Sequence, residues 1–336
     1  MSNLLVTLGP ASFHEPVIRE MAGLGVQLFR INLSHTALED LPRLIDRIQR
    51  ACDVPICLDS EGAQLRNQKM ENDGVGFAAG ATVKIHYEPV LGDAGNISFA
   101  PPGIARQLEP GDIVRIDFNL AALQVVEKNG HYSVAKVVAP GLVGSNKAAD
   151  VNRELPLEPI TAKDRAAFEI GKKAGVTNYS LSFAGSSRDV AQCRELVGDG
   201  AQIISKIESR QGLRNLKDIL AVSDGILIDR GDLSRQVPIE KIPFLQMRII
   251  SLARIHDTPV YVATNLLETM LERQTPNRAE MNDVISTLLM GANGLVLAAE
   301  TAIGRYPVEA VKVARRAFEL CRRWTPNSNI QEILEM

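Results

Sequence analysis

The sequence predicts an α/β fold, a (β/α)8 barrel with a small β-barrel lid domain inserted after its third strand. Eight short apolar runs, each typical of a buried parallel strand, alternate with longer segments of helical periodicity. Eight such strand–helix units are the number that closes a parallel sheet into a barrel. The same alternation leaves an open, doubly wound sheet as the alternative.

The first three units precede the interruption. The expected strands and helices are, in chain order, residues 4–8, 15–24, 26–33, 38–51 and 54–58. In the second of these helices, Leu41, Leu44, Ile45 and Ile48 share one face, which favours a helix packed on the outside of a sheet. We therefore assign residues 1–67 to the first part of the barrel.

Residues 68–155 follow a different pattern, with short strand-like runs and many turn residues. The sequence Lys128-Asn129-Gly130 is typical of a hairpin turn, with the return strand at residues 131–138. This segment is predicted to form the inserted β domain.

The strand–helix alternation then resumes for five more units, in residues 156–326, and residues 327–336 form a tail. Thr161 is the expected cap of the first helix of this part, and Pro243 suits the first turn of a later one. The expected elements are residues 161–173, 176–183, 187–196, 202–207, 212–222, 225–228, 243–256, 259–263, 278–290, 294–297 and 307–323.

The composition narrows the function classes. Of 336 residues, 45% are hydrophobic, which is enough for a large core, and the net charge of −3 indicates neither nucleic acid nor an anionic membrane as partner. No apolar run approaches a membrane span, and the first residues lack a secretory pattern, so we expect a cytoplasmic protein. The four cysteines lack metal-site spacing and are expected as free thiols, and the five scattered histidines argue against a zinc site.

Charged residues follow several of the predicted strands. Since the carboxyl ends of barrel strands meet at one mouth, we expect Arg30, Lys206, Glu208, Arg230 and Asp232 to converge there. Glu208 and Asp232 have the ligand type that Mg²⁺ prefers, and the nearby cations suit a phosphoryl group. Structural ion pairs are the competing interpretation of each charge taken singly.

Blocks of sequence around these residues resemble the pyruvate kinase family, in the same order and with similar spacing from residue 4 to about 324. The blocks are residues 8–12, 30–35, 59–62, 144–147, 205–208, 223–226, 230–233, 263–264, 277–280, 300–302 and 306–310. The resemblance implies a phosphotransferase that moves a phosphoryl group from phosphoenolpyruvate to ADP, giving pyruvate and ATP, and it implies the interrupted barrel independently.

The resemblance also implies roles for individual residues. Lys206, Arg30 and Thr264 would be catalytic, through phosphoryl stabilisation, phosphate contact and proton delivery. Glu208 and Asp232 would bind Mg²⁺ or Mn²⁺. The remaining expectations are Arg230, Gly231, Asp232, Thr264 and Ser182 for substrate, His35, Arg66 and Lys147 for nucleotide, and Asn32, Ser34, Asp59 and Ser60 for K⁺.

The sequence departs from the family pattern mainly on the nucleotide side. Glu61 stands where the family has a lysine, which reverses a charge, and Gln64 replaces a glutamate that the family links to K⁺ dependence. Further departures are Ala63, Ala184-Gly185-Ser186, Asp117-Phe118-Asn119 and Ala299, and the sequence stops where the family continues into an effector domain.

Three functions remain open at this point. The first is the phosphotransferase, with ADP and ATP as partners. The second is a repurposed barrel that acts as a lyase, aldolase or decarboxylase on a 2-oxo acid through an enolate. The third is a catalytically weak metabolite-binding protein. We expect a homo-oligomer in each case, because apolar surface that a missing domain would cover must face a partner.

Overall fold

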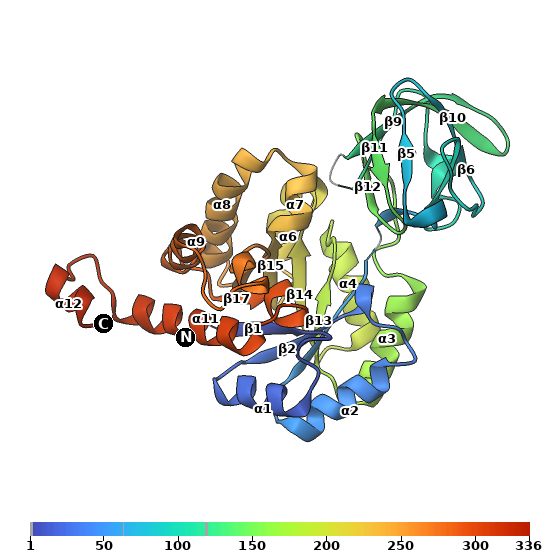
Figure 1. Cartoon of the computed structure of the whole chain (residues 1–336). Helices are drawn as coiled ribbons and strands as arrows, with labels where there is room; N and C mark the ends of the chain where they lie inside the picture. Colours follow the sequence, from blue (N-terminus) through green and yellow to red (C-terminus); the bar gives the residue numbers. More distant parts are fainter. Residues whose placement is uncertain (1–2, 63, 118–119) are drawn as a thin grey trace. The chain divides into compact units, whose positions relative to one another are not determined.

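The computed structural model describes residues 3–62, 64–117 and 120–336, and the chain separates into two compact units (Figure 1). The first unit comprises Met1–Gly62 and Pro159–Met336, and the second is Ala63–Glu158. The sequence analysis placed the corresponding boundaries at residues 67 and 155. Ala63, Phe118 and Asn119, three of the departures named above, lie outside the described residues.

The first unit is a closed barrel of eight strands, all paired in parallel. In order around the barrel they are β1 (Asn3–Leu8), β17 (Gly294–Leu297), β16 (Val260–Ala263), β15 (Gly225–Asp229), β14 (Gln202–Ile207), β13 (Asn178–Leu181), β3 (Ile56–Asp59) and β2 (Leu28–Asn32). The closure confirms the predicted (β/α)8 fold and excludes the open sheet.

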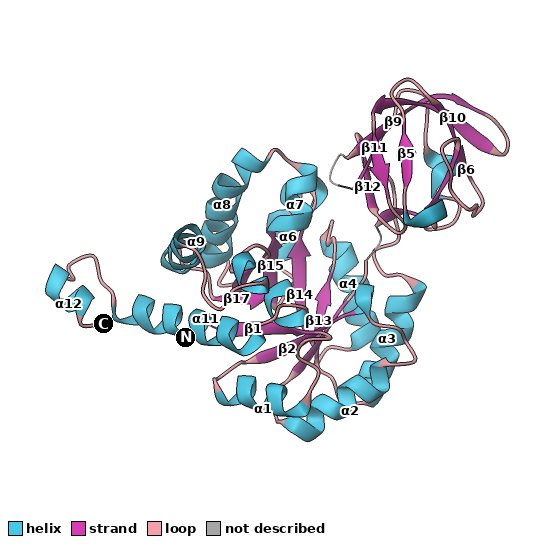
Figure 2. Cartoon of the chain, viewed as in Figure 1, coloured by secondary structure: helices cyan, strands magenta, loops and turns pink. Residues whose placement is uncertain are grey.

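Helices surround this barrel, as the alternation predicts (Figure 2). They are α1 (Glu15–Gly23), α2 (Leu41–Ala51), α3 (Ala162–Lys173), α4 (Ser187–Val197), α5 (Arg210–Arg214), α6 (Leu216–Leu220), α8 (Ile242–Ile255), α9 (Arg278–Leu289) and α11 (Pro307–Arg323). In α2 the four predicted apolar residues are the buried ones. Thr161 caps α3 as expected, in a capping box with Asp164.

The structure differs from the prediction in four places. The helix expected at residues 212–222 is broken at Asn215 into α5 and α6. Helix α7 (Arg230–Gln236) begins where a strand end was expected. The short helices α10 (Ala299–Ala302) and α12 (Ile330–Leu334) were not expected. Helices this short carry too few residues for a hydrophobic period, so periodicity does not reveal them.

The barrel interior has an apolar part and a polar part. The apolar part is a hydrophobic cluster separate from the larger core between strands and helices. It comprises Leu5, Leu28, Cys57, Ile204, Leu227, Ala263 and Val296, with Tyr261 packed against it. Side chains on a strand alternate, so Thr7, Arg30, Asp59, Lys206 and Asp229, each two residues after one of these, also point inward. All five are buried. They form the floor of the mouth at the carboxyl ends of the strands.

The second unit has a closed barrel of seven strands and a core of its own. In order they are β10 (Tyr132–Ala139), β6 (Thr82–His86), β7 (Asn96–Ala100), β4 (Leu65–Asn67), β12 (Ala148–Val151), β8 (Ile113–Ile116) and β9 (Ala121–Lys128). Strands β9 and β10 form the predicted hairpin. A separate pair, β5 (Val75–Phe77) and β11 (Gly141–Val143), completes the unit.

Two expectations from composition can be compared with the structure. The four cysteines are free thiols, as predicted. None of the helices in the described ranges combines the length and the hydropathy that crossing a bilayer requires.

Candidate active site

Lys206 occupies the centre of the barrel mouth. Its place on β14 turns the side chain inward, where only 6% of it is exposed. The ammonium Nζ lies 2.9 Å from Oε1 of Glu208, 3.4 Å from Oδ2 of Asp59 and 3.9 Å from Oδ2 of Asp229. It also donates a hydrogen bond of 3.1 Å to the hydroxyl of Ser182. Side chains from four strands or strand ends therefore meet at one cation.

Arg30 is a second buried cation in the same mouth. Its guanidinium donates to Asp59 Oδ2 at 2.6 Å and to the Thr7 hydroxyl at 2.8 Å. The Nε atom is buried and donates no hydrogen bond to any residue that the structure describes. One donor of Arg30 is thus left over for a ligand.

Three carboxylates lie close together beside Lys206. One oxygen from each of Glu208, Asp229 and Asp232 lies within 4.8 Å of the others. Glu208 directly follows β14, and its Oε2 accepts a 2.7 Å hydrogen bond from the N–H of Phe183. The sequence suggested Glu208 and Asp232 as the metal pair, and the structure brings them together.

Asp229 was not selected from the sequence, although the signal was present. It is the last residue of β15, two positions after the inward-facing Leu227, so alternation directs it into the mouth. Asp232, in contrast, lies in the first turn of α7 and not at a strand end. The acid that the strand itself contributes is Asp229.

The buried charges set one another's protonation. Burial opposes the charged form of Lys206, but Asp59, Glu208 and Asp229 outweigh it and raise the pKa of the ammonium above its usual value. Burial raises the pKa of Glu208 to about 8, although Lys206 pulls it down. Burial acts on Asp229 too, but Lys206 and the Thr264 hydroxyl bring its pKa below the usual value. Lys206 is therefore a permanent cation in this site.

The carboxylates fit a hard divalent cation such as Mg²⁺ or Mn²⁺. Oε1 of Glu208 already meets the ammonium of Lys206 at 2.9 Å, but among the described residues the buried Oδ1 of Asp59 has no hydrogen-bond donor. Buried oxygens without donors are costly unless a cation meets them. The donor set contains only oxygen, which is the preference of these ions.

Thr264 is held at the edge of the site by hydrogen bonds with Asp229 and Arg230. Thr264 has a φ of +76°, a rare value for a β-branched residue, and its hydroxyl donates to Asp229 at 2.7 Å. The Arg230 guanidinium donates to the Thr264 carbonyl oxygen at 2.6 and 3.1 Å and to Asp283 at 2.6 Å. A Cβ at Gly231 would lie 2.9 Å from the Thr264 methyl group. Arg230, expected at the substrate, thus uses its donors to hold Thr264.

The residues expected around K⁺ lie on the adjacent β2 and β3 side. Oδ1 of Asn32 accepts the N–H of Ser34 at 3.0 Å, and the Ser60 hydroxyl accepts the N–H of Ser182 at 2.8 Å. Asp59 Oδ2 faces Arg30 and Lys206. These oxygens already hold local structure, and each retains acceptor capacity for a cation.

Asp164 and Lys163, at the start of α3, are two residues that sequence analysis missed. The carboxylate of Asp164 is fully buried and accepts from the backbone N–H groups of Glu61 and Gly62, at 2.7 and 3.2 Å, besides those of its capping box. Lys163 lies 3.8 Å from the Glu61 carboxylate and donates to the Leu33 carbonyl oxygen at 2.5 Å. A lysine is therefore present beside the glutamate that reverses the family's charge.

The residues expected at the nucleotide are divided between the units. His35 is exposed on the barrel unit, at the end of the 3-10 turn Leu33–His35. Arg66 and Lys147 belong to the second unit, where Arg66 donates to the Asn146 carbonyl oxygen at 3.0 Å and Lys147 lies 3.2 Å from Asp117. The hydroxyl oxygen of the neighbouring Ser145 accepts a hydrogen bond from the N–H of Met70.

A closed parallel barrel with buried cations and clustered carboxylates at the carboxyl ends of its strands is the architecture of a barrel enzyme. Residues 1–311 match the family described as "Pyruvate kinase, barrel domain". The chain therefore belongs to the pyruvate kinase family, and with it to the phosphotransferase enzymes.

Individual relatives agree with this assignment. The pyruvate kinase of Methylorubrum extorquens is 35% identical over 328 residues, which is 96% of this chain and 69% of the relative. That of Thermotoga maritima is 32% identical, with 93% and 69% covered. The crystal structure of a Cryptosporidium parvum pyruvate kinase superposes with a TM-score of 0.87 at 29% identity, covering 97% of this chain and 70% of that one. Some relatives are longer: the chain spans 55% of the length of the pyruvate kinase of Bacillus licheniformis.

Proposed function

We propose that this chain transfers a phosphoryl group from phosphoenolpyruvate to ADP, and that the mouth of the barrel is its active site. The observation that carries the proposal is the buried ammonium of Lys206 among Asp59, Glu208 and Asp229. Phosphoryl transfer needs little covalent work from the protein but much charge stabilisation and positioning. A permanently charged lysine beside a carboxylate metal site provides both.

Lys206 and Arg30 act as fixed cations in this proposal. With its pKa raised, Lys206 does not give up its proton, so it stabilises negative charge on the enol oxygen and the moving phosphoryl group rather than acting as an acid. Arg30 adds the unpaired Nε–H as a donor toward phosphate oxygens. The hydrogen bonds of both side chains to Asp59 and to strand residues keep them in position before substrate binds.

Glu208, Asp229 and Asp232 would hold the divalent cation. When bound, such an ion polarises phosphoryl and enolate oxygens. The part of the protein is to present three carboxylate oxygens at close range and to exclude other ligands. Asn32, Ser34, Asp59 and Ser60 would hold K⁺ next to it.

Thr264 is proposed to organise the proton that converts the enolate to pyruvate. Its hydroxyl donates to Asp229, so its proton is directed at that carboxylate and not at the substrate. A water held by the Thr264 oxygen would give a proton to the enolate carbon, and solvent would return that proton to the water, since the overall reaction consumes one proton; the strained backbone of Thr264 fixes where this occurs. The residues His35, Arg66 and Lys147 are proposed for the nucleotide.

A coupled assay tests the proposal. Purified protein with phosphoenolpyruvate, ADP, Mg²⁺ and K⁺ is expected to form ATP and pyruvate in equal amounts. If no ATP forms above background, the phosphotransferase is rejected for this chain. Deuterium exchange into the methyl group of pyruvate then separates an enolising lyase-type barrel, which exchanges, from a binding protein, which does not.

A further inference from the structure

Helix α7 carries a cation that touches the carboxylate cluster. Arg235 lies one turn after Asp232, and its Nη1 atom lies 2.6 Å from Oδ1 of that carboxylate. Only 5% of the arginine side chain and 26% of the aspartate side chain are exposed. The ion pairs of Lys206 extend to Glu208 and Asp229, whereas Asp232 takes its cation from α7 itself.

An arginine three residues after an aspartate is a common helix ion pair, and the same spacing occurs at the start of α2. There Arg43 pairs with Asp40 at 2.8 Å, but 66% and 49% of the two side chains are exposed. Water and salt screen such a pair, so it has little influence on other charges. The pair of Arg235 and Asp232 differs because it is shielded from water and because one member belongs to the candidate metal site.

The backbone of α7 is held by contacts that do not involve the arginine side chain. Leu233 is fully buried in the core of the barrel unit. The Ser234 hydroxyl donates to the Gly231 carbonyl oxygen at 2.7 Å, and Arg210 donates to the Gln236 carbonyl oxygen at 2.6 Å. A substitution at position 235 is therefore expected to remove the charge and leave the helix in place.

We propose that Arg235 is the counter-ion of Asp232 while the metal site is empty, and that its charge makes binding of a divalent cation depend on an anionic substrate. A divalent cation at Asp232 would meet a guanidinium on the same carboxylate, and two cations at this range repel each other. A bound anion offsets that repulsion, because it attracts both cations. The divalent cation and the anion then strengthen each other's binding by the same factor.

The sign of the effect separates this role from a purely structural one. If Arg235 served only to orient Asp232 as a ligand, its removal would weaken binding of the divalent cation. If it competes with that cation, its removal strengthens binding, both because a repulsive charge is lost and because three neighbouring acids are left with less compensation. The inference rests on the divalent site of the proposed function, but not on phosphoryl transfer itself.

Titration with Mn²⁺, followed by electron paramagnetic resonance, tests the proposal without any assay of activity. It is done with and without saturating oxalate, a dianion that has the carboxylate and adjoining oxyanion of an enolised 2-oxo acid. Without oxalate, Arg235→Gln is expected to bind Mn²⁺ about 3–10-fold more tightly than the wild type. Oxalate should tighten Mn²⁺ binding about 5–150-fold in the wild type, and by a factor at least about 3-fold smaller in Arg235→Gln.

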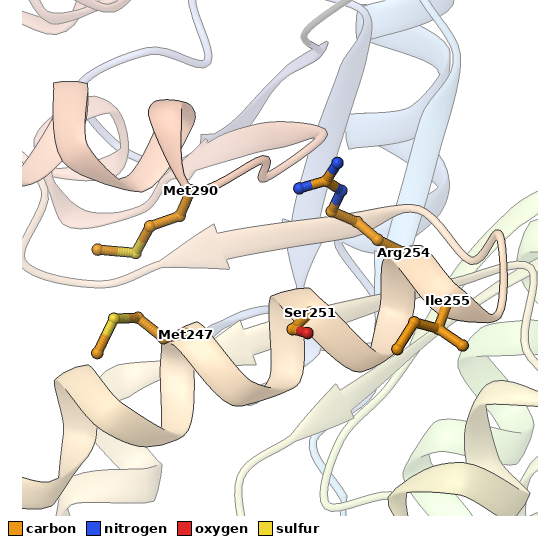
Figure 3. Close-up of a pocket in the computed structure, with 5 residues that line it drawn as sticks. All are labelled: Met247, Ser251, Arg254, Ile255 and Met290. Atoms are coloured by element: carbon orange, nitrogen blue, oxygen red, sulfur yellow. The ribbon is translucent and has the colours of Figure 1, made fainter.

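Two arginines serve as controls for the loss of one positive charge. Arg43→Gln removes a pair of the same spacing that is exposed and remote from the cluster. Arg254 lines a groove of about 440 Å³ between α8 and the end of α9 (Figure 3). It lies in the last turn of α8, shortly before β16 begins, and so at the end of the barrel opposite the mouth. Arg43→Gln and Arg254→Gln should bind Mn²⁺ within about 2-fold of the wild type.

Further variants keep the test decisive. Arg235→Lys retains the charge and should stay within about 2-fold of the wild type, and Arg235→Met replaces the glutamine variant if circular dichroism shows that the latter is unfolded. Unchanged or weaker Mn²⁺ binding by the uncharged variant overturns the proposal, and so does an oxalate effect as large as that of the wild type. No Mn²⁺ binding in any form overturns the metal site as well. Failure of the coupled assay, with these titrations as expected, rejects phosphoryl transfer alone.

Discussion

The two sides of the barrel mouth differ in how they hold charge. On one side, Lys206, Glu208 and Asp229 are almost fully buried, and both carboxylates lie within 4 Å of the lysine nitrogen. On the other, Glu61 and Lys163 form a pair of 3.8 Å with 28% and 30% of their side chains exposed. Lys206 and Glu208 lie in a block of sequence that resembles the family, whereas Glu61 departs from the family pattern.

The difference indicates which charged residues can be substituted with little effect on the reaction. Buried charges interact strongly because water does not screen them, and each holds the protonation of the next. Exposed pairs contribute at most about 1 kcal/mol and weaken with salt. We therefore expect the buried side to decide whether chemistry occurs, and the exposed side to adjust which acceptor binds and how tightly.

The largest effect is expected from Lys206→Met. Loss of the central cation should lower kcat about 100–1000-fold, as removal of a preorganised charge-stabilising donor does in other enzymes. The far-UV circular dichroism spectrum should stay that of the folded barrel. Lys163→Met is the matched control on the exposed side and should keep kcat within a few-fold. Similar losses in the two variants would remove the contrast between the sides.

Asp164 sharpens the comparison, because it is a buried acid on the otherwise exposed side. Asp164→Ala leaves the N–H groups of Glu61 and Gly62 without an acceptor, and should lower the free energy of unfolding by about 3 kcal/mol. Urea unfolding measures this. Asp189→Ala is the control, since Asp189 closes a similar capping box on α4 with local partners only, and should cost about 1 kcal/mol. Equal costs would show that the long-range bonds add nothing.

Asp229→Asn should weaken binding of the divalent cation about 10–100-fold, because one of three clustered carboxylates loses its charge. Binding of Mn²⁺ followed by electron paramagnetic resonance measures this without any assay of activity. The same substitution at Asp224, which pairs with Arg194 away from the mouth, should leave Mn²⁺ affinity unchanged. Unchanged Mn²⁺ affinity in Asp229→Asn would mean that Asp229 is not a ligand and that Glu208 and Asp232 alone bind the cation.

Most of the barrel could be predicted from the sequence, because its signals are long and local. Apolar runs and helical periodicity located all eight strands, and Thr161 marked the start of α3. The convergence of Lys206 and Glu208 followed from strand alternation and from the geometry of a parallel barrel.

The remainder depends on contacts that no local pattern shows. Asp232 was taken as part of a strand end, since a seven-residue helix after β15 is too short for a period. The carboxylate of Asp164 reaches N–H groups about 100 positions earlier in the chain, a pairing that only the closed barrel creates. The exposure of Phe244, Met247 and Ile255 on the outward side of α8 could not be predicted either, because periodicity alone does not show which sides of an apolar helix are covered.

The smallest effect, and the most direct test of the exposed side, is expected from Glu61→Lys. The substitution turns an ion pair into two neighbouring cations, which should lower KM for ADP about 3–10-fold at low ionic strength and leave KM for phosphoenolpyruvate unchanged. Raising the salt concentration should reduce the gain, because the charges are partly exposed. Glu169→Lys, in the pair with Lys172 on the same helix, is the control and should change neither constant. A change shared by both substrates would mean that Glu61 acts on the whole mouth and not on the nucleotide, and the division into a chemical side and an acceptor side would then fail.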